Sequence, residues 1–198
     1  MSVPRQIVAP QGNKPCMGIV QDALLGISRL TNRDTFIDKP FVMNILMWVN
    51  YNFDLGLPHP AIIKPKPLWT GKQILSLIIP KSINLENGDK WMSPKDETIV
   101  IQQGELLAGV VAKKIVGNTP GGLIHIIWKD LGPQACCDIL SNIQLVVNNW
   151  LVNTGYTVGV SDIVAKSEII DQVQAKIREY KKEVKKVIST TQMGKLVR

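Results

Sequence analysis

Residues 70–73 come closest to a motif that could hold phosphate. Thr70, Gly71, Lys72 and Gln73 resemble the end of a phosphate-binding loop, in which backbone amides and a lysine contact the phosphates. The glycine that this motif needs five positions before Gly71 is Lys66, and Gln73 stands where the hydroxyl residue should follow the lysine. The pattern therefore fails at two positions and predicts a turn.

Metal-ligating and nucleophilic residues are present but poorly spaced. His59 and His125 are far apart in sequence, the three cysteines lack C-x-x-C spacing, and no nucleophile elbow surrounds a serine. Asp22, Asp34 and Asp38 are close in sequence, yet the first two bracket a short predicted helix and a turn. Helix capping is favoured over metal binding for these aspartates. The sequence thus predicts no catalytic residue and no metal site.

Composition narrows the class of protein. The chain has 198 residues, of which 45% are hydrophobic and 20% charged, with a formal net charge of +7. These values exclude a disordered chain, and no apolar run approaches the ~20 residues of a transmembrane helix. Three cysteines make no disulfide framework, which indicates a reducing compartment. Residues 167–198 carry eight Lys or Arg against four Asp or Glu, consistent with a nucleic-acid-facing surface or a solvated helix face.

The first two thirds of the chain mixes short elements. Apolar spacing predicts a helix over residues 22–30 and another over 41–51, with Asp38 as its N-cap before Pro40. Residues 61–67 read as extended because two prolines forbid a helix. Residues 74–79 fit a short helix or a strand, and residues 83–91 an irregular loop. Residues 98–101 and 106–112 predict a β-hairpin.

The last third predicts helices. One begins at Gly132 and Pro133, runs to about Val152, and is ended by Gly155. After a linker over residues 156–166, a final helix carries apolar residues at heptad spacing: Ile170, Val173, Ile177, Tyr180, Val184 and Val187. Such a seam needs a second helix, from another chain or from sequence beyond this one. The fold class is therefore α+β, a small mixed domain followed by a long helical arm.

Several long blocks resemble one family. They read RQIVAPQGNKPCMGIVQDALLG from Arg5, AIIKPKPLWTGKQILS from Ala61, GELLAGVVAKKIVG from Gly104, GGLIHIIW from Gly121 and NIQLVVNNWL from Asn142. In this order they resemble the largest subunit of eukaryotic DNA-directed RNA polymerase II, in the pore region and the start of the funnel. The resemblance implies that residues 1–155 form the pore domain and that residues 156–198 begin a funnel domain that continues beyond them.

The resemblance implies part of an enzyme. The parent enzyme transfers nucleotides to RNA in the nucleus, with two metal ions assisting the reaction. Its Mg²⁺ is held by three aspartates of an Asn-Ala-Asp-Phe-Asp-Gly-Asp motif that this sequence lacks and that lies upstream in the family. No catalytic residue or cofactor is therefore assigned here, and the chain alone should be inactive. The implied partners are other polymerase subunits, template DNA, RNA, nucleoside triphosphates and a transcript-cleavage factor, without a membrane.

The resemblance also implies site residues. Lys113 and Lys114, on the loop after the returning strand, match the family's basic pair in the pore, and Gln21 and Asp22 match positions close to the active centre. From the residues alone, a solvated turn for the two lysines and a helix start for Gln21 and Asp22 are the favoured interpretations. Where the family has GIGDTIAD, residues 159–166 read GVSDIVAK, in which Ser161 replaces a glycine and Lys166 replaces an acid.

Two alternative functions stay open at this stage. One is a free-standing basic nucleic-acid-binding module, against which stand the unburied heptad seam and the lack of an aromatic stacking platform. The other is a structural scaffold that contacts no ligand. The two lysines distinguish a scaffold from a ligand-contacting segment, because only the latter needs their charge.

Overall fold

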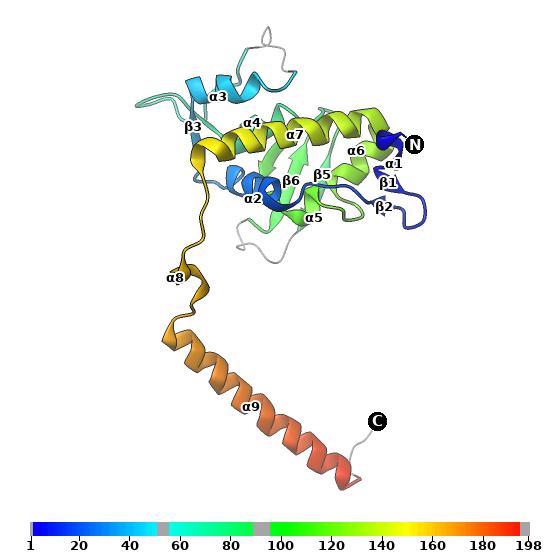
Figure 1. Ribbon diagram of the computed structural model, residues 1–198, viewed down its shortest axis with the longest axis vertical. Helices are drawn as coiled ribbons and strands as arrows, with labels where there is room; N and C mark the ends of the chain where they lie inside the picture. The colour runs from blue at the N-terminus through cyan, green and yellow to red at the C-terminus, as the bar shows by residue number, and fades with distance from the viewer. Residues whose placement is uncertain (1, 51–55, 89–95, 195–198) are drawn as a thin grey trace. The chain divides into compact units, whose positions relative to one another are not determined.

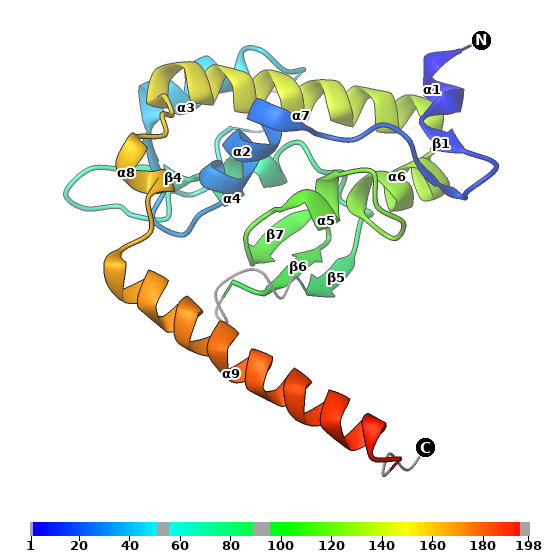
Figure 2. The same cartoon turned by 60° about the horizontal axis from the view of Figure 1, so that its bottom comes forward.

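A computed structural model describes residues 2–50, 56–88 and 96–194. The chain divides into two compact units, Met1–Gly155 and Tyr156–Arg198, each considered by itself (Figures 1 and 2). The first unit combines small antiparallel sheets with helices, and the second contains a long helix. The expected α+β class is confirmed.

The N-terminal residues form a small hairpin. Helix α1 (Val3–Gln6) precedes strands β1 (Val8–Ala9) and β2 (Lys14–Pro15), which pair antiparallel. The amide of Cys16 extends this pairing by donating to the carbonyl of Ile7 at 2.8 Å.

Helix α2 (Gln21–Leu30) packs on the long helix α7 (Pro133–Thr154). Its apolar residues Ala23, Ile27 and Leu30 are buried, as the predicted periodicity requires. The two backbones come close at Gly26, where a Cβ would lie 2.5 Å from a methyl of Val147. The helix predicted over residues 22–30 is confirmed.

Strand β3 (Phe36–Asp38) and helix α3 (Lys39–Leu46) follow, and β3 pairs antiparallel with β4 (Leu68–Thr70). The helix predicted to reach residue 51 ends at Leu46, and Tyr51 lies outside the described residues. Asp38 occupies the N-cap position, but its side chain makes no capping hydrogen bond. Instead, its carboxylate accepts from Lys66 Nζ at 3.0 Å, so it ties the helix start to the proline-rich loop.

Residues 70–73, which resemble a phosphate-binding loop only in part, form the start of a helix. Helix α4 (Gly71–Ser76) carries a capping box, in which Thr70 accepts from the amide of Gln73 while the Gln73 side chain accepts from the amide of Thr70. A Cβ on Gly71 would lie 2.0 Å from the carbonyl oxygen of Leu30. This glycine therefore allows α4 to approach the end of α2. The start of residues 74–79, for which the sequence allowed a short helix or a strand, belongs to this helix.

A three-stranded antiparallel sheet contains β5 (Leu85–Gly88), β6 (Thr98–Gln102) and β7 (Glu105–Ala108). The predicted hairpin is present, with Gln103 and Gly104 at φ +50° and +76° in its two-residue turn. The returning strand ends at Ala108 instead of residue 112, because Gly109 turns the chain at φ +86°. The prediction of an irregular loop over residues 83–91 was wrong at Leu85–Gly88, which adds β5 to the sheet.

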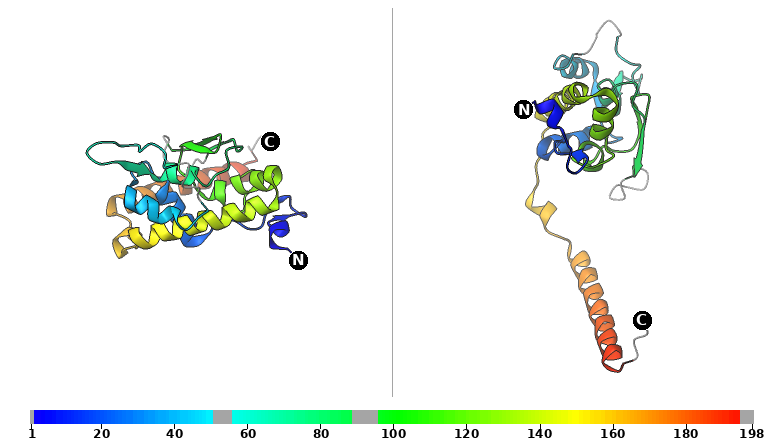
Figure 3. Two further views of the ribbon diagram at one scale, coloured as in Figure 1. Left: turned by 90° about the horizontal axis from the view of Figure 1, so that it is seen from above. Right: turned by 90° about the vertical axis from the view of Figure 1, so that its right-hand side faces the viewer.

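The first unit closes with helices α5 (Lys113–Val116), α6 (Leu123–Leu131) and α7. Helix α7 begins at Pro133 and ends before Gly155 at φ +72°, as predicted. It runs along the first unit and contacts α1, α2, α3 and α6 (Figure 3). The core lies between α7 and the sheets; its largest fully buried side chains include Ile27, Leu30, Ile45, Leu46, Ile74, Leu75, Ile99, Ile115 and Leu123.

The second unit holds the short helix α8 (Val160–Ile163) and α9 (Ser167–Gln192). None of the described α9 residues is buried, and the heptad residues from Ile170 to Val187 are 44–61% exposed. The predicted helix and its apolar seam are thus present. Among the described helices, none is both long and apolar enough to cross a membrane.

Candidate functional site

Lys113 and Lys114 begin helix α5, in place of the loop expected after the returning strand. Both side chains are exposed, whereas the next two residues, Ile115 and Val116, are buried. Lys114 Nζ donates to the carbonyl oxygen of Gly88 at the end of β5. The structure gives the ammonium group of Lys113 no partner among the described residues. The short helix therefore anchors its apolar half in the core and presents two ammonium groups, one of them braced.

The chain entering α5 is held by a buried threonine. Thr31, at the end of α2, is fully buried, and its hydroxyl donates to the carbonyl of Ile27 at 2.8 Å. The same oxygen accepts from the amide of Val111 at 3.0 Å. Because one hydroxyl satisfies groups in both segments, it fixes the approach to α5 relative to α2.

Gln21 and Asp22 are the first two residues of α2, and both are exposed. Gln21 has φ +50°, a region that non-glycine residues occupy uncommonly. Such backbone outliers occur disproportionately at functional positions. Gln21 and Asp22 therefore form a helix start, which is the interpretation that their own residues favour.

The structure brings the segment just before α2 next to the end of α5. The amide of Ile19 donates to the carbonyl of Val116 at 2.8 Å. A Cβ on Gly18 would lie 2.6 Å from the carbonyl carbon of Gly117, so the two backbones touch there. The chain just before α2 therefore runs beside the end of α5, and Figure 1 shows both helices in the same part of the first unit.

We call the exposed residues Gln21, Asp22, Lys113 and Lys114 the α2–α5 surface. They come from segments about ninety positions apart that lie on neighbouring backbone. Two lysines against one aspartate leave this surface a net positive charge. Lysine ammonium groups attract phosphates as point charges, without reading the base. The arrangement can therefore hold or guide phosphorylated ligands.

Sequence patterns did not indicate the residues that build this surface. Thr31 is an ordinary helix-end threonine in the sequence, and Gly18 belongs to no glycine motif. Their partners, Val111 and Gly117, are far away along the chain. Only the folded backbone shows why position 31 needs a hydroxyl and why position 18 needs a residue without a side chain.

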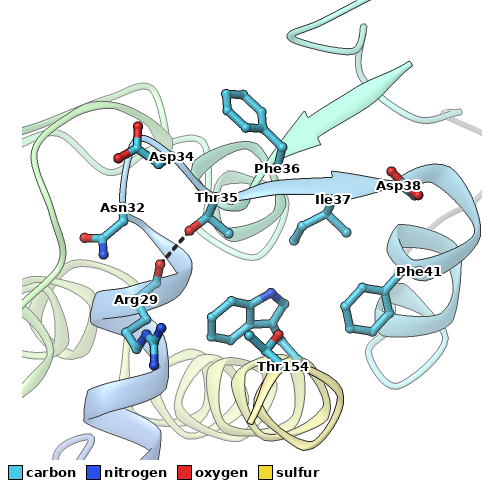
Figure 4. A pocket seen from close by; sticks show the side chains of 10 residues that line it. Arg29, Asn32, Asp34, Thr35, Phe36, Ile37, Asp38, Phe41 and Thr154 are labelled. Carbon is cyan, nitrogen blue, oxygen red and sulfur yellow. Dashed lines mark hydrogen bonds between the residues drawn. The ribbon is translucent and has the colours of Figure 1, made fainter. Parts of the chain in front are cut away.

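A separate pocket of about 590 Å³ opens between α2, β3, α3 and α7 (Figure 4). Its lining combines polar and aromatic side chains, and within it Thr35 Oγ1 donates to the carbonyl of Arg29 at 2.8 Å. Asp34 and Asp38 line this pocket, whereas Asp22 does not. The three aspartates considered together in the sequence are thus not brought to one place.

Other titratable groups lie away from the surface. Arg33 Nη2 and Asp96 Oδ1 form an ion pair at 2.5 Å, between residues that no sequence pattern connects. Burial lowers the pKa of Lys72, and burial raises the pKa of the Cys136 thiol to about 11, with Cys137 adding to the shift. Within the described ranges, no three His, Cys, Asp or Glu residues are grouped so that they could hold a metal ion.

Comparisons with known proteins assign the family. Residues 6–163 match the sequence model of RNA polymerase Rpb1, domain 3. The chain belongs to this family. It is also 42% identical, over 190 residues, to the DNA-directed RNA polymerase II subunit RPB1-B of Trypanosoma brucei brucei. That match covers 94% of this chain and 10% of the relative, so this Rpb1 segment spans about a tenth of the relative's length.

The Rpb1 match confirms the resemblance to the largest subunit of RNA polymerase II. The segment is therefore part of a DNA-directed RNA polymerase subunit, and the alternative of a free-standing nucleic-acid-binding module is not favoured. The family match includes the whole α2–α5 surface and ends at Ile163, before α9.

Proposed function

We propose that this Rpb1 segment forms the pore and the start of the funnel in the largest subunit of RNA polymerase II. Residues 1–155 form the pore domain, and residues 156–198 begin the funnel. The segment works in the nucleus during DNA-templated RNA synthesis, assembled with other polymerase subunits. The family assignment and the basic α2–α5 surface support this proposal.

The observation that carries the proposal is the contact of α5 with the chain that leads into α2. Residues matched to the pore's basic pair and residues matched to positions near the active centre lie on adjoining backbone, joined by the hydrogen bond between Ile19 and Val116. A scaffold would not need two exposed lysines at this point. A path for phosphorylated molecules would need such lysines, because their positive charge balances the negative charge of the phosphates along the path.

The segment's part in the chemistry is electrostatic. The ligands expected at the α2–α5 surface are nucleoside triphosphates, pyrophosphate and the phosphate backbone of displaced RNA, together with acidic residues of a transcript-cleavage factor. Magnesium supplies the charge stabilisation of nucleotidyl transfer in the assembled enzyme. The described residues provide no matching ligand set, and we assign the metal to aspartates elsewhere in the subunit.

Replacing Lys113 and Lys114 by alanine in the assembled polymerase tests the proposal. We expect the KM for nucleoside triphosphates to rise about fivefold, which corresponds to about 1 kcal/mol. The rate at saturating nucleotide should change little, and the effect should shrink as salt screens the charges. Steady-state elongation assays at several salt concentrations measure both quantities.

Two controls accompany this experiment. A double variant at two other exposed lysines, Lys81→Ala and Lys129→Ala, removes the same charge elsewhere and should leave KM unchanged. The chain alone should show no nucleotidyl transfer. Equal KM values for the α5 variant and the wild type would favour a purely structural role and contradict the proposal.

A further inference from the structure

A side chain from the loop after α5 binds the backbone of the lysine pair. Thr119 is half-buried, and its hydroxyl donates to the carbonyl oxygen of Lys114 at 2.6 Å. Helix α5 has four residues, too few to be stable by its own hydrogen bonds. Its conformation therefore depends on the groups that bind its backbone from outside.

The carbonyls of α5 are satisfied in different ways. That of Lys113 accepts from the amide of Gly117 at 2.8 Å, and that of Val116 accepts from Ile19 at 2.8 Å. Both bonds join backbone groups, so a side-chain substitution leaves their donors and acceptors in place. Within the described ranges, the bond from Thr119 is the one by which a side chain holds a carbonyl of α5.

The local backbone keeps Thr119 in this position. Pro120 follows it and restricts its backbone to extended conformations. Gly122 folds back against the same point, where an added Cβ would lie 3.1 Å from the Lys114 oxygen and 3.3 Å from Thr119 Oγ1. The hydroxyl is thus confined beside the carbonyl that it binds.

We propose that Thr119 is a positioning residue for the basic pair. Its hydroxyl fixes the carbonyl of Lys114 and thereby the orientation of the turn that carries both lysines, without itself touching a ligand. This inference rests on the proposed function of the α2–α5 surface. Its consequence is that removing one hydroxyl weakens nucleotide binding through lysines that remain in place.

The test uses Thr119→Val in the assembled polymerase, since valine keeps the shape and lacks the hydroxyl. We expect the KM for nucleoside triphosphates to rise roughly twofold, as for loss of one net hydrogen bond, with kcat unchanged. Thr119→Ser should restore the wild-type KM. Thr35→Val is the matched control, because it removes a hydroxyl that also donates to a carbonyl, that of Arg29.

A double-mutant cycle separates positioning from a general structural role. In polymerase that already carries Lys113→Ala and Lys114→Ala, Thr119→Val should produce no further rise in KM. An additive effect there, or an equal fall in kcat, would overturn the inference. If Thr119→Val prevents assembly, Thr119→Ala takes its place in the same cycle.

The cycle also distinguishes the two proposals. A raised KM in the lysine variant with an unchanged KM in the threonine variant overturns the role of Thr119 alone. An unchanged KM in the lysine variant overturns the proposed function of the surface.

Discussion

Thr31 shows how one buried polar group can join two parts of the fold. Its hydroxyl donates to Ile27 and accepts from Val111, so both its hydrogen-bonding capacities are used inside the core. A buried amide that loses its acceptor retains the full penalty of leaving water. The position of α5 relative to α2 therefore depends on this side chain.

Replacing Thr31 by valine should lower the free energy of unfolding by about 1–3 kcal/mol, because the Val111 amide is left buried without an acceptor. Urea denaturation of the whole chain measures this change. Thr35→Val removes a hydroxyl whose bond to Arg29 is exposed, and it should cost less than about 1 kcal/mol. Equal losses in the two variants would contradict the special role of Thr31.

At the residue scale, the sequence indicated the site only through resemblance. Charge and residue type could not separate Lys113 and Lys114 from other exposed lysines, and without the resemblance a solvated turn was the favoured interpretation. Their proximity to Gln21 depends on backbone contacts over long sequence separation. No local sequence pattern encodes such long-range contacts, so they could not be predicted from the residues alone.

Among the elements, α4 is held in place by close approach. Thr70 and Gln73 cap its start, and Gly71 lets the helix touch the last carbonyl of α2. This fit explains why a glycine stands at the first position of a helix, where most residues would be acceptable. It also explains a motif that resembles a phosphate-binding loop without its remaining residues.

Gly71→Ala should destabilise the chain by about 2–4 kcal/mol, because the new methyl group would collide with the Leu30 carbonyl. Thermal or urea unfolding provides the measurement. Gly12→Ala serves as the control, since its Cβ would have nothing nearer than the Lys14 side chain at 3.5 Å and should change stability by less than about 0.5 kcal/mol. A tolerated alanine at residue 71 would contradict the packing described.

Elements with strong periodicity were predicted well. Helices α2 and α7 have apolar faces over several turns and clear boundary residues such as Pro133 and Gly155. Strand β5 was missed because its four residues, Leu85–Gly88, are short and mostly polar, and it exists by pairing with β6. Short apolar runs such as residues 123–128 fit a buried strand or a buried helix, and the structure makes this run part of α6.

At the scale of the whole molecule, the two units differ in how their helices are stabilised. Helix α7 buries six of its residues in the first unit. Helix α9 is longer, at 26 residues against 22, yet none of its described residues is buried. Helical stability in proteins comes mainly from packing of an apolar face.

Hydrogen exchange in the whole chain should therefore be faster along α9 than along α7, despite the greater length of α9. Peptide-resolved mass spectrometry measures this difference, with the exposed linker residues 157 and 158 as a rapidly exchanging reference. Equal protection in the two helices would contradict the exposed state of the heptad seam.

The central claim is that the α2–α5 surface faces the path of nucleotides in the assembled polymerase. A periodate-oxidised nucleoside triphosphate tests it most directly, because its aldehyde forms an imine with a nearby lysine amine and borohydride reduction makes the bond permanent. Peptide mapping should find the label at Lys113 and Lys114, more at Lys113 because Lys114 also bonds Gly88. Label confined to lysines such as Lys81 and Lys129, with none in α5, would contradict the claim.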